Sequence, residues 1–556
     1  MRRPKLSNLH RHPALLVFAL VCALLAVAPR AAPQAAGQSA AATENELATR
    51  EALAQLRAGG NAVDAAVAAA LVAGVASPTS SGIGGGGFVV VWLADKQQPY
   101  VLDFRETAPQ KIDPSWFEAR PFAANERGKQ VGVPGEVMGL FELHRHHGRR
   151  QWKDLVLPAA RAAKNGFPIG RHLEQMLDSS AASLRVDPGI LGVYFPKGKP
   201  GVVGQLVKNP KLAATLERIA AEGPKAFYEG PVAQDLVGAA RSLGGALTLE
   251  DMKAYRPVER QPLVVHWEGY DVYTMPPPSA GGLMLVQALG MFTSAELKAL
   301  GKNSGAYQHM VGEALRSAIA DRMRFLGDPD LVNADVPRLI AAPRLAQRKK
   351  LFALDRTHAT PRFGLEGGGT HHLVTADRSG NVVSLTTTVN RLFGAKITGG
   401  ESGVVLNDEL DDFTEQKAVK PFGMNQSPNR ARPLARPVSS MTPTIVVRAG
   451  RPVLAIGGSG GPAIATNVTE LVLNRLVFAT KPNELVSGPR FYVPTTGPTI
   501  LLEAQATPEL IKDLEARGEV VGKMPFAGSA VQLIAIENGR KFPASDPRKH
   551  GSARAE

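Results

Sequence analysis

The order of apolar and polar residues predicts a largely helical first part of the chain. Residues 50–56 repeat apolar positions with helical spacing, and a second helix is expected over 63–75 with Asn61 as its cap. Residues 88–93 form a continuous apolar run that is typical of a buried strand. Between about residues 130 and 350, helical stretches alternate with loops that contain proline and glycine.

The pattern changes near residue 370, where strands replace helices. Residues 371–376 and 382–389 have strand patterns, and 377–381 between them is rich in turn residues, which together predict a β-hairpin. The chain contains no tandem repeat. Residues 545–556 are rich in charge, glycine and serine, so we expect a frayed end.

The first 33 residues have the pattern of a secretory signal peptide. Residues 1–12 contain several basic side chains and no acid, 14–28 form an apolar run that is short for a membrane span, and small residues follow. Removal of this segment predicts a periplasmic or secreted protein without a stable membrane span, and an uncleaved anchor is the alternative. Residues 34–43, rich in alanine, glutamine and serine, are expected to be disordered.

Composition narrows the classes of function. The formal charge is +14, and five of the positive charges lie in the leader, which leaves about +9. Aromatic residues make up 6% of the chain and no basic run interleaves with them, so nucleic-acid binding is not expected. The single cysteine, Cys22, lies in the leader. A mature chain without it has no disulfide, no thiol catalysis and no cysteine-bound metal.

Two motifs suggest a cofactor or a metal but lack the required context. Residues 82–87 satisfy G-x-G-x-x-G, yet a helix precedes them and a strand follows, the reverse of the order that binds a pyrophosphate. We interpret these glycines as sites of close backbone packing. Residues 144–147 (His-Arg-His-His) end a predicted helix, where cations suit the helix dipole. No cofactor and no metal site are therefore predicted.

The glycine-rich stretch 457–461 allows a serine-hydrolase interpretation. It lies between a predicted strand, 452–456, and a helix from 463 to about 478, so Ser459 takes the place of a nucleophile in G-x-S-x-G. Such a serine needs a later histidine, and the only one is His550, in the expected frayed end. A Ser459 α/β-hydrolase stays as an alternative. In either case, the N–H groups that start the following helix could stabilise an oxyanion.

Thr370 is a second candidate nucleophile, because it directly follows three glycines and opens a predicted strand. A threonine hydroxyl is a weak nucleophile unless a base lies beside it. Cleavage before Thr370 would provide an α-amine, whose usual pKa of about 8 suits a base at neutral pH. On this motif alone, a glycine–threonine loop without catalytic function is the alternative.

A series of short motifs supports Thr370, rather than Ser459, as the nucleophile. They are GGNAVDAA (59–66), SGIGGGGF (81–88), DFRE (103–106), VPG (133–135), LGDPD (326–330), THH (370–372), GESG (400–403), DDF (411–413) and PVSSM (437–441). In this order they resemble the γ-glutamyltransferase (glutathione hydrolase) family across nearly all of the mature length. Many motifs in one order are more specific than any one of them.

The resemblance implies an N-terminal nucleophile hydrolase, whose fold is an α/β (α+β) four-layer αββα sandwich made as one precursor. Thr370 would attack the carbonyl of Gly369, and hydrolysis of the resulting ester would separate two subunits. The large subunit would comprise residues 44–369 and the small subunit 370–556, both forming one interleaved catalytic domain.

The resemblance also assigns catalytic roles. Thr370 would attack the γ-glutamyl amide and form an acyl-enzyme. Thr388 matches the threonine that orients the nucleophile, and Gly460 and Gly461 match the glycines whose N–H groups form the oxyanion hole. No cofactor is implied, because this chemistry needs only a hydroxyl, an amine and N–H groups.

The implied substrate-binding residues match the two charges of a γ-glutamyl group. Arg105 corresponds to the guanidinium that binds the α-carboxylate, where a bidentate fork is stronger than a lysine. Ser439 and Ser440 would donate hydroxyls to the same carboxylate. The residues on the α-amine side are Asn390, Glu409 and Asp412.

The implied function is to cut the γ-glutamyl amide of glutathione and related peptides and to pass the γ-glutamyl group to water, an amino acid or a peptide. A glutaryl or poly-γ-glutamyl amide acylase of the same fold and an inactive homologue that serves as a binding protein are alternatives. His371 stands where many relatives have a second threonine. Residues 414–437, where some relatives have a lid, contain no tyrosine, so no gating residue is assigned.

Overall fold

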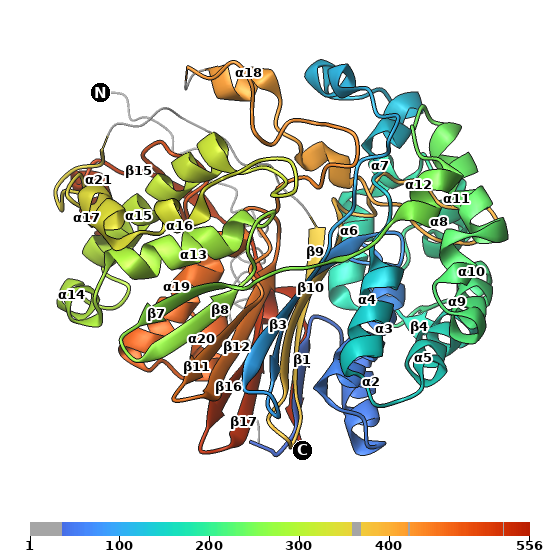
Figure 1. Ribbon diagram of the computed structural model, residues 1–556, viewed down its shortest axis with the longest axis horizontal. Helices are drawn as coiled ribbons and strands as arrows, with labels where there is room; N and C mark the ends of the chain where they lie inside the picture. Colours follow the sequence, from blue (N-terminus) through green and yellow to red (C-terminus); the bar gives the residue numbers. More distant parts are fainter. Residues whose placement is uncertain (1–35, 359–368, 421–422, 526–527) are drawn as a thin grey trace, which may run out of the picture. The chain divides into compact units, whose positions relative to one another are not determined.

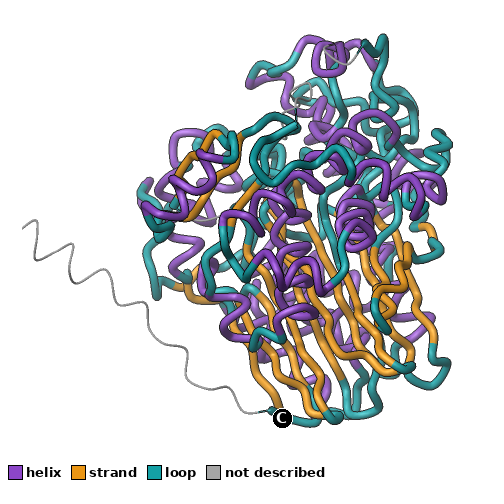
Figure 2. Tube along the Cα trace, turned by 90° about the vertical axis from the view of Figure 1, so that its left-hand side faces the viewer, coloured by secondary structure: helices purple, strands orange, loops and turns teal. Residues whose placement is uncertain are grey.

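Two β-sheets pack face to face at the centre of the molecule, and helices cover the outer face of each (Figure 1). The computed structural model describes residues 36–358, 369–420, 423–525 and 528–556; the predicted signal peptide lies outside these ranges. Figure 2 shows the strands of the sheets running side by side beneath the helices. The arrangement is the four-layer αββα sandwich that the resemblance implied.

The first sheet has seven strands, all antiparallel to their neighbours, in the order β18-β1-β9-β10-β2-β3-β6. The predicted hairpin forms its central pair, β9 and β10. β1 lies beside this hairpin, and β18, from the other end of the chain, lies beyond β1. The bounds are β1 Ala40–Thr43, β2 Gly86–Leu93, β3 Gln98–Phe104, β6 Val258–Glu259, β9 Gly369–Ala376, β10 Val382–Asn390 and β18 Ser552–Ala555.

The second sheet has six antiparallel strands in the order β17-β16-β12-β11-β8-β7. Its strand β12 runs to Ser459, beyond the predicted end at residue 456, because Gly457 and Gly458 continue the pairing with β16. The bounds are β7 Leu263–Trp267, β8 Tyr270–Thr274, β11 Thr444–Arg448, β12 Arg451–Ser459, β16 Ala530–Glu537 and β17 Arg540–Ser545; smaller sheets comprise β13 Phe491–Tyr492, β14 Thr499–Glu503 and β15 Val520–Met524, and β4 Phe167–Pro168 and β5 Leu206–Val207.

One helical layer covers the first sheet and begins with the two predicted helices. In α3, Asn61 accepts hydrogen bonds from two N–H groups of the first turn, and Asp64 accepts from the Asn61 N–H, which completes a capping box. The helices of this half are α2 Glu46–Arg57, α3 Ala62–Ala76, α4 Glu136–His147, α5 Trp152–Asn165, α6 Arg171–Ser179, α7 Ala181–Leu184, α8 Pro188–Tyr194, α9 Pro210–Glu222, α10 Lys225–Tyr228, α11 Gly230–Arg241 and α12 Leu249–Ala254, with 3₁₀ turns η1 Pro114–Ala119, η2 Ala124–Gln130 and η3 Pro196–Gly198.

The other helical layer covers the second sheet, with α13 and α19 against its strands. Its helices are α13 Ala280–Met291, α14 Ser294–Leu300, α15 Gly305–Phe325, α16 Val336–Leu339, α17 Ala342–Lys349, α19 Ala463–Phe478, α20 Pro482–Ser487 and α21 Pro508–Ala516. Three short helical segments lie in connections, namely η4 Glu409–Asp412, α18 Gln416–Val419 and η6 Pro547–Lys549.

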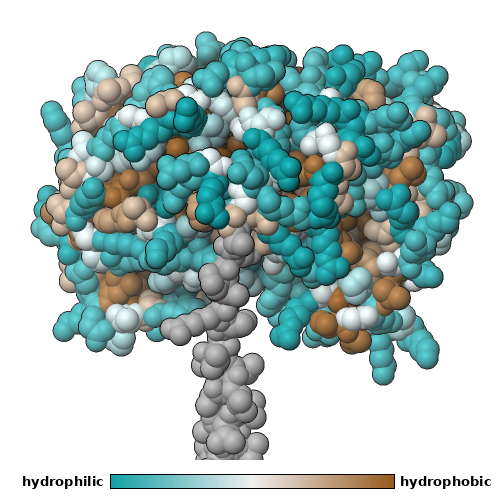
Figure 3. Space-filling view, turned by 90° about the horizontal axis from the view of Figure 1, so that it is seen from below, coloured by the Kyte–Doolittle hydropathy of each residue, from teal (hydrophilic) through white to brown (hydrophobic). Residues whose placement is uncertain are grey.

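The outer surface is mainly polar. Figure 3 shows one face on which hydrophilic side chains predominate and apolar ones form small separate groups.

Among the described residues, no single helix is long and apolar enough to cross a membrane. The pair α13 and α14 meets the length and composition criteria only together, with a bend of 83° between them. Most of α13 is buried in the protein core, which accounts for its apolar character.

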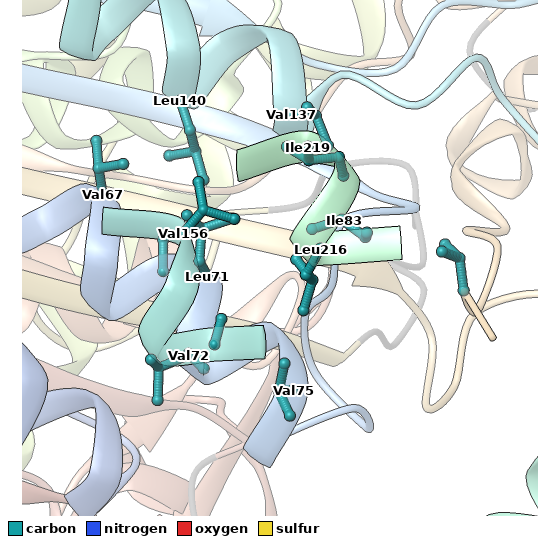
Figure 4. Packing of buried hydrophobic residues seen from close by; sticks show 14 of the residues in the cluster. Val67, Leu71, Val72, Val75, Ile83, Val137, Leu140, Val156, Leu216 and Ile219 are labelled. Carbon is teal, nitrogen blue, oxygen red and sulfur yellow. The ribbon is translucent and has the colours of Figure 1, made fainter. Parts of the chain in front are cut away.

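Alternate residues of the first sheet pack into two different cores. Val89 and Val91 face the helices α3, α4 and α5, whereas Val90 and Trp92 face the second sheet. Figure 4 shows part of the first core, where Leu71 of α3 lies among apolar side chains of α4, α5 and α9. Because both faces of the first sheet are covered, its strand β2 is apolar in a continuous run rather than in alternation.

Two expectations about the chain ends are wrong. Residues 36–43 were expected to be disordered, but they include β1, which is fully buried and pairs with β9 on one side and β18 on the other. The expected frayed end, 545–556, contains η6 and β18. Alanine-rich and charged segments carry little local preference for order, and each end is ordered here by pairing with the other.

Candidate active site

A cavity of about 420 Å³ opens beside the start of β9, the end of β10 and the junction of β12 with α19. All the site residues predicted from the sequence lie in its wall except Gly460, which adjoins Gly461. The predicted residues in the wall are Arg105, Thr370, Thr388, Asn390, Glu409, Asp412, Ser439, Ser440 and Gly461.

The Thr370 hydroxyl lies beside the Thr388 hydroxyl at the centre of this wall. The two Oγ1 atoms are 3.4 Å apart, and Thr388 Oγ1 also donates to the Gly369 carbonyl at 2.6 Å and accepts from the Asn390 N–H at 2.8 Å. Because Thr388 gives its only proton to Gly369, Thr370 must be the donor between the two hydroxyls. Thr388 therefore both orients Thr370 and polarises the peptide bond before it.

An irregularity in the hairpin creates this geometry. The register of β9 with β10 shifts between Thr387 and Asn390, so Thr388 lies in a bulge opposite Thr370. A bulge bends its strand and redirects a side chain. Asn390 has a positive φ of 72° at the end of the bulge, and its side-chain amide donates to the Asp408 carbonyl.

The two candidate oxyanion glycines lie between β12 and α19. Gly460 and Gly461 have φ of 120° and 63°, a region that favours glycine. A Cβ on Gly460 would lie 2.0 Å from the Gly528 carbonyl oxygen, so no larger residue fits there. The N–H groups at the start of a helix have no partner within it and point outward. Gly461 directs this end of α19 toward the cavity that contains Thr370.

In the same cavity wall, Arg105 forms a buried ion-pair cluster. Its guanidinium is 1% exposed and pairs with Glu409, which is equally buried, and with Asp412 at 2.6 Å. Burial raises the pKa of Glu409 well above its usual value, although Arg105 opposes this shift. Asp412 is 26% exposed and faces the cavity. The cluster thus presents both signs of charge to a ligand that carries an ammonium and a carboxylate.

Arg322 is a lining residue that the sequence analysis missed. It lies on α15, and its guanidinium donates to the Ser440 hydroxyl, which is one of the predicted carboxylate ligands. Ser439, beside it, accepts from the Met441 N–H at 3.1 Å. The feature of the sequence that could have identified Arg322 is its short distance along the chain from the motif LGDPD. Nothing in the local pattern separates this arginine from the other basic residues of the same helix.

The stretch 414–437, which was considered as a lid, borders the cavity in part. Its lining residues are Thr414, Glu415, Lys417 and Ala418. Lys417 is 64% exposed and forms an ion pair with Glu415. These side chains form part of the cavity wall and provide both signs of charge there.

The geometry opposes the Ser459 alternative. Ser459 is fully buried, is absent from the cavity wall, and accepts a hydrogen bond from Lys549 at 2.7 Å. Among the described residues, no hydrogen bond joins Ser459 to His550. Its position on the last residue of β12 is fixed by pairing with β16.

The other motifs of the sequence have structural roles. A Cβ on Gly84 or Gly85 would lie about 2 Å from the carbonyl oxygen of a neighbouring strand or loop, which confirms close backbone packing in 82–87. The run 144–147 ends α4, as predicted.

One acidic and histidine cluster has the composition of a metal site. His309, Glu313 and Glu519 bring ligand atoms within 4.8 Å of one another. Both ring nitrogens of His309 are already hydrogen-bonded, to Glu519 and to a backbone carbonyl, and Arg316 pairs with both glutamates. We interpret this cluster as a buried ion-pair network.

Comparisons with known proteins place this geometry in context. The family model described as "Gamma-glutamyltranspeptidase" matches residues 48–556. Glutathione hydrolase 2 of Arabidopsis thaliana is 36% identical over 525 residues, which cover 89% of this chain and 90% of that protein. The glutathione hydrolase proenzyme of Escherichia coli K12 is 32% identical over 523 residues, which cover 91% and 90%. The crystal structure of a cephalosporin acylase from Bacillus halodurans superposes with a TM-score of 0.83 at 24% identity and covers 96% of this chain and 98% of its own, which shows the shared fold.

Proposed function

Because this chain belongs to the gamma-glutamyltranspeptidase family, we propose that it is a self-cleaving glutathione hydrolase and γ-glutamyltransferase whose nucleophile is Thr370. The observation that carries the proposal is the pair of hydroxyls beside a polarised peptide bond. Thr388 donates to the Gly369 carbonyl and accepts from Thr370, as self-cleavage at this bond requires.

Self-cleavage follows from this arrangement. Thr370 Oγ1 attacks the Gly369 carbonyl carbon, the C–N bond breaks, and the hydroxyl proton passes to the departing nitrogen. The product is an ester whose hydrolysis leaves a carboxylate on Gly369 and a free α-amine on Thr370. The small subunit is then 370–556, and the large subunit is 44–369 together with β1, which directly precedes it. The word "proenzyme" in the name of the E. coli relative supports a processed precursor.

The mature nucleophile repeats this chemistry on a substrate. The new α-amine takes the proton of Oγ1, which attacks the γ-glutamyl carbonyl, while the N–H groups of Gly460 and Gly461 stabilise the oxyanion. The leaving amine takes a proton as it departs. Water or the amine of an amino acid or peptide then releases the γ-glutamyl group from Thr370.

Donor recognition uses the charged cluster around Arg105. The α-carboxylate of the substrate is bound by Arg105 with Ser439 and Ser440, and the α-amine by Asp412, Glu409 and Asn390. Arg105 and Asp412 pair with each other, and a γ-glutamyl group supplies each with an opposite charge. A glutaryl group has no amine to offer the acidic side, so we favour γ-glutamyl donors over glutaryl ones.

The experiment that tests this function is the intact mass of the denatured protein, with Thr370→Ala beside the wild type. We expect two fragments that meet between Gly369 and Thr370 in the wild type and an uncut variant. A wild type that stays whole, or a variant that is cut, contradicts the proposal. Turnover of γ-glutamyl and glutaryl anilides then decides donor class, and faster glutaryl release indicates an acylase instead.

The cellular setting proposed for this enzyme is the periplasm or the extracellular space. The basic and apolar pattern of residues 1–33 supports it. Glutathione-like peptides, amino acids and peptide acceptors are the partners that such a location supplies.

A further inference from the structure

The start of β9, which contains the nucleophile, is paired with a neighbouring strand on one side only. On that side β10 supplies partners to His371 and His372. On the other side β1 pairs with β9 only over Leu373–Ala376, because β1 ends at Thr43. The backbone of Thr370–His372 therefore extends beyond the end of its second neighbour.

A buried ion pair occupies the place of the missing strand. Lys549 Nζ donates to the Thr370 carbonyl at 2.7 Å, and Glu44 Oε1 accepts the His372 N–H at 3.0 Å. Lys549 and Glu44 also bind each other at 2.9 Å. One backbone acceptor and one backbone donor of β9 are thus satisfied by side chains from η6 and from the residue after β1.

The same lysine also holds the strand that leads to the oxyanion glycines. Its third hydrogen bond goes to Ser459 Oγ at 2.7 Å, directly before Gly460. An ammonium group has three donors, and all three are used here. Because Lys549 and Glu44 are 9% and 2% exposed, solvent cannot readily replace these bonds. The lysine thereby fixes the Thr370 carbonyl relative to the end of β12.

The histidines near this ion pair have lowered pKa values, so Lys549 provides the positive charge that pairs with Glu44. His371 Nδ1 lies 3.8 Å from Glu44, and burial lowers the pKa of His371 to about 4, so the ring is neutral near pH 7. A second cavity, of about 260 Å³, borders Lys549 and Glu44 on the side of His172 and His550. Burial lowers the pKa of both these histidines as well.

We propose that Lys549, paired with Glu44, is a positioning residue that holds Thr370 in place for self-cleavage and, above all, for catalysis after the chain is cut. In the precursor, Thr370 is anchored by peptide bonds on both sides. After cleavage its only covalent anchor is the bond to His371, and Lys549 holds the carbonyl of that bond. This inference rests on the proposed function, since it assumes that Thr370 is the mature nucleophile.

The test compares three variants of the full chain. Lys549→Met removes the ammonium and keeps most of the length of the side chain. Glu44→Gln/Lys549→Met removes both charges, so that no unpaired carboxylate is left buried. The control is Lys541→Met, because Lys541 is also buried, at 4% exposure, but lies in β17. For each we measure the rate of self-cleavage, kcat and KM with a γ-glutamyl anilide, and Tm.

We expect kcat to fall about 10- to 100-fold in both Lys549 variants, with KM within about twofold of the wild type, because a misplaced nucleophile affects the reaction more than binding. Lys541→Met should keep the wild-type kcat. A Lys549 variant that folds but is not cut gives no kcat. For such a variant, self-cleavage at least tenfold slower than in the control supports the same role. A kcat and cleavage rate like those of the wild type in the double variant, or an equal loss in Lys541→Met, overturns it.

Failure of the proposed function gives a different result. A wild type that is cut but does not turn over γ-glutamyl anilides contradicts the donor assignment, and the cleavage rates of the Lys549 variants still decide this inference. A wild type that turns over substrate beside equally active Lys549 variants contradicts the positioning role alone.

Discussion

At the residue scale, the hydroxyl of Thr388 contacts both Thr370 and the Gly369 carbonyl, so both proposed reactions should depend on it. We predict that Thr388→Val lowers kcat and the rate of self-cleavage about 10- to 100-fold, because Thr370 loses its acceptor and the Gly369 carbonyl loses its donor. Thr388→Ser retains the hydroxyl and should stay within a few fold of the wild type. Time-resolved intact mass and anilide turnover measure both rates. Equal rates in the valine and serine variants would exclude this role.

Arg105 serves substrate binding and the stability of the free protein at once. We predict that Arg105→Lys raises KM for a γ-glutamyl anilide at least about tenfold, because an ammonium cannot bind in the bidentate way of a guanidinium. Arg105→Ala should in addition lower the free energy of unfolding by about 1–3 kcal/mol, since it leaves the buried carboxyl of Glu409 without its hydrogen-bond partner. Initial-rate kinetics and denaturant titration separate the two effects. An unchanged KM in the lysine variant would refute the assignment to the carboxylate.

The free energy of unfolding is expected to depend on pH through the buried carboxyl of Glu136. Burial raises its pKa to about 8, against a smaller opposing effect of its hydrogen bond with Thr387. The unfolded carboxyl ionises near pH 4.5, so its contribution is fully present below that pH and is lost as pH rises through about 8. Glu136→Gln should therefore reduce the fall in unfolding free energy between about pH 6 and pH 8 by about 2 kcal/mol.

Denaturant titrations at several pH values test this, with Glu46→Gln as an exposed control on α2. A wild type and a Glu136→Gln variant with parallel pH profiles would mean that Glu136 is ionised in the folded protein.

At the element scale, the junction of β12 with α19 is the proposed site of oxyanion stabilisation. We predict that Gly460→Ala lowers kcat about 100-fold or more, because the added Cβ meets the Gly528 carbonyl and displaces the N–H groups. The control is Gly539→Ala, which also has a positive φ, of 78°, but has no atom within 4 Å of the new Cβ. Steady-state kinetics on both variants distinguish displacement of the N–H groups from backbone strain. Similar kcat values for the two would contradict this role of Gly460.

At the scale of the whole molecule, the proposed cut leaves two subunits whose strands alternate in one sheet. In the order β18-β1-β9-β10-β2-β3-β6, the small-subunit strands β9 and β10 lie between the large-subunit strands β1 and β2. We predict that the matured protein runs as one species on size exclusion and separates into two fragments only in denaturant, because separation would break the pairings of β1 with β9 and β18, of β10 with β2 and of β11 with β8. Native and denaturing mass measurements check this. Fragments that separate without denaturant would contradict it.

The sequence by itself determined the elements whose signals are local. The hairpin of β9 and β10, the cap of α3 at Asn61 and the helix after Gly461 depend on neighbouring residues, and they lie where the patterns predicted them. The motif resemblance indicated the family and a set of residues that the fold gathers around one cavity. Short-range periodicity and specific motifs carry this information because each needs only a few adjacent residues.

The ordered structure of the two chain ends and the surroundings of Thr370 arise only from tertiary contacts. The segment around β1 has the composition of a disordered tail, and it becomes a strand because β9 and β18 satisfy its backbone on both sides. Glu44 and Lys549 are 505 positions apart, and Arg322 reaches Ser440 from another layer of the fold. No local pattern records such partners, because burial and charge pairing at these positions arise only when distant strands are brought together.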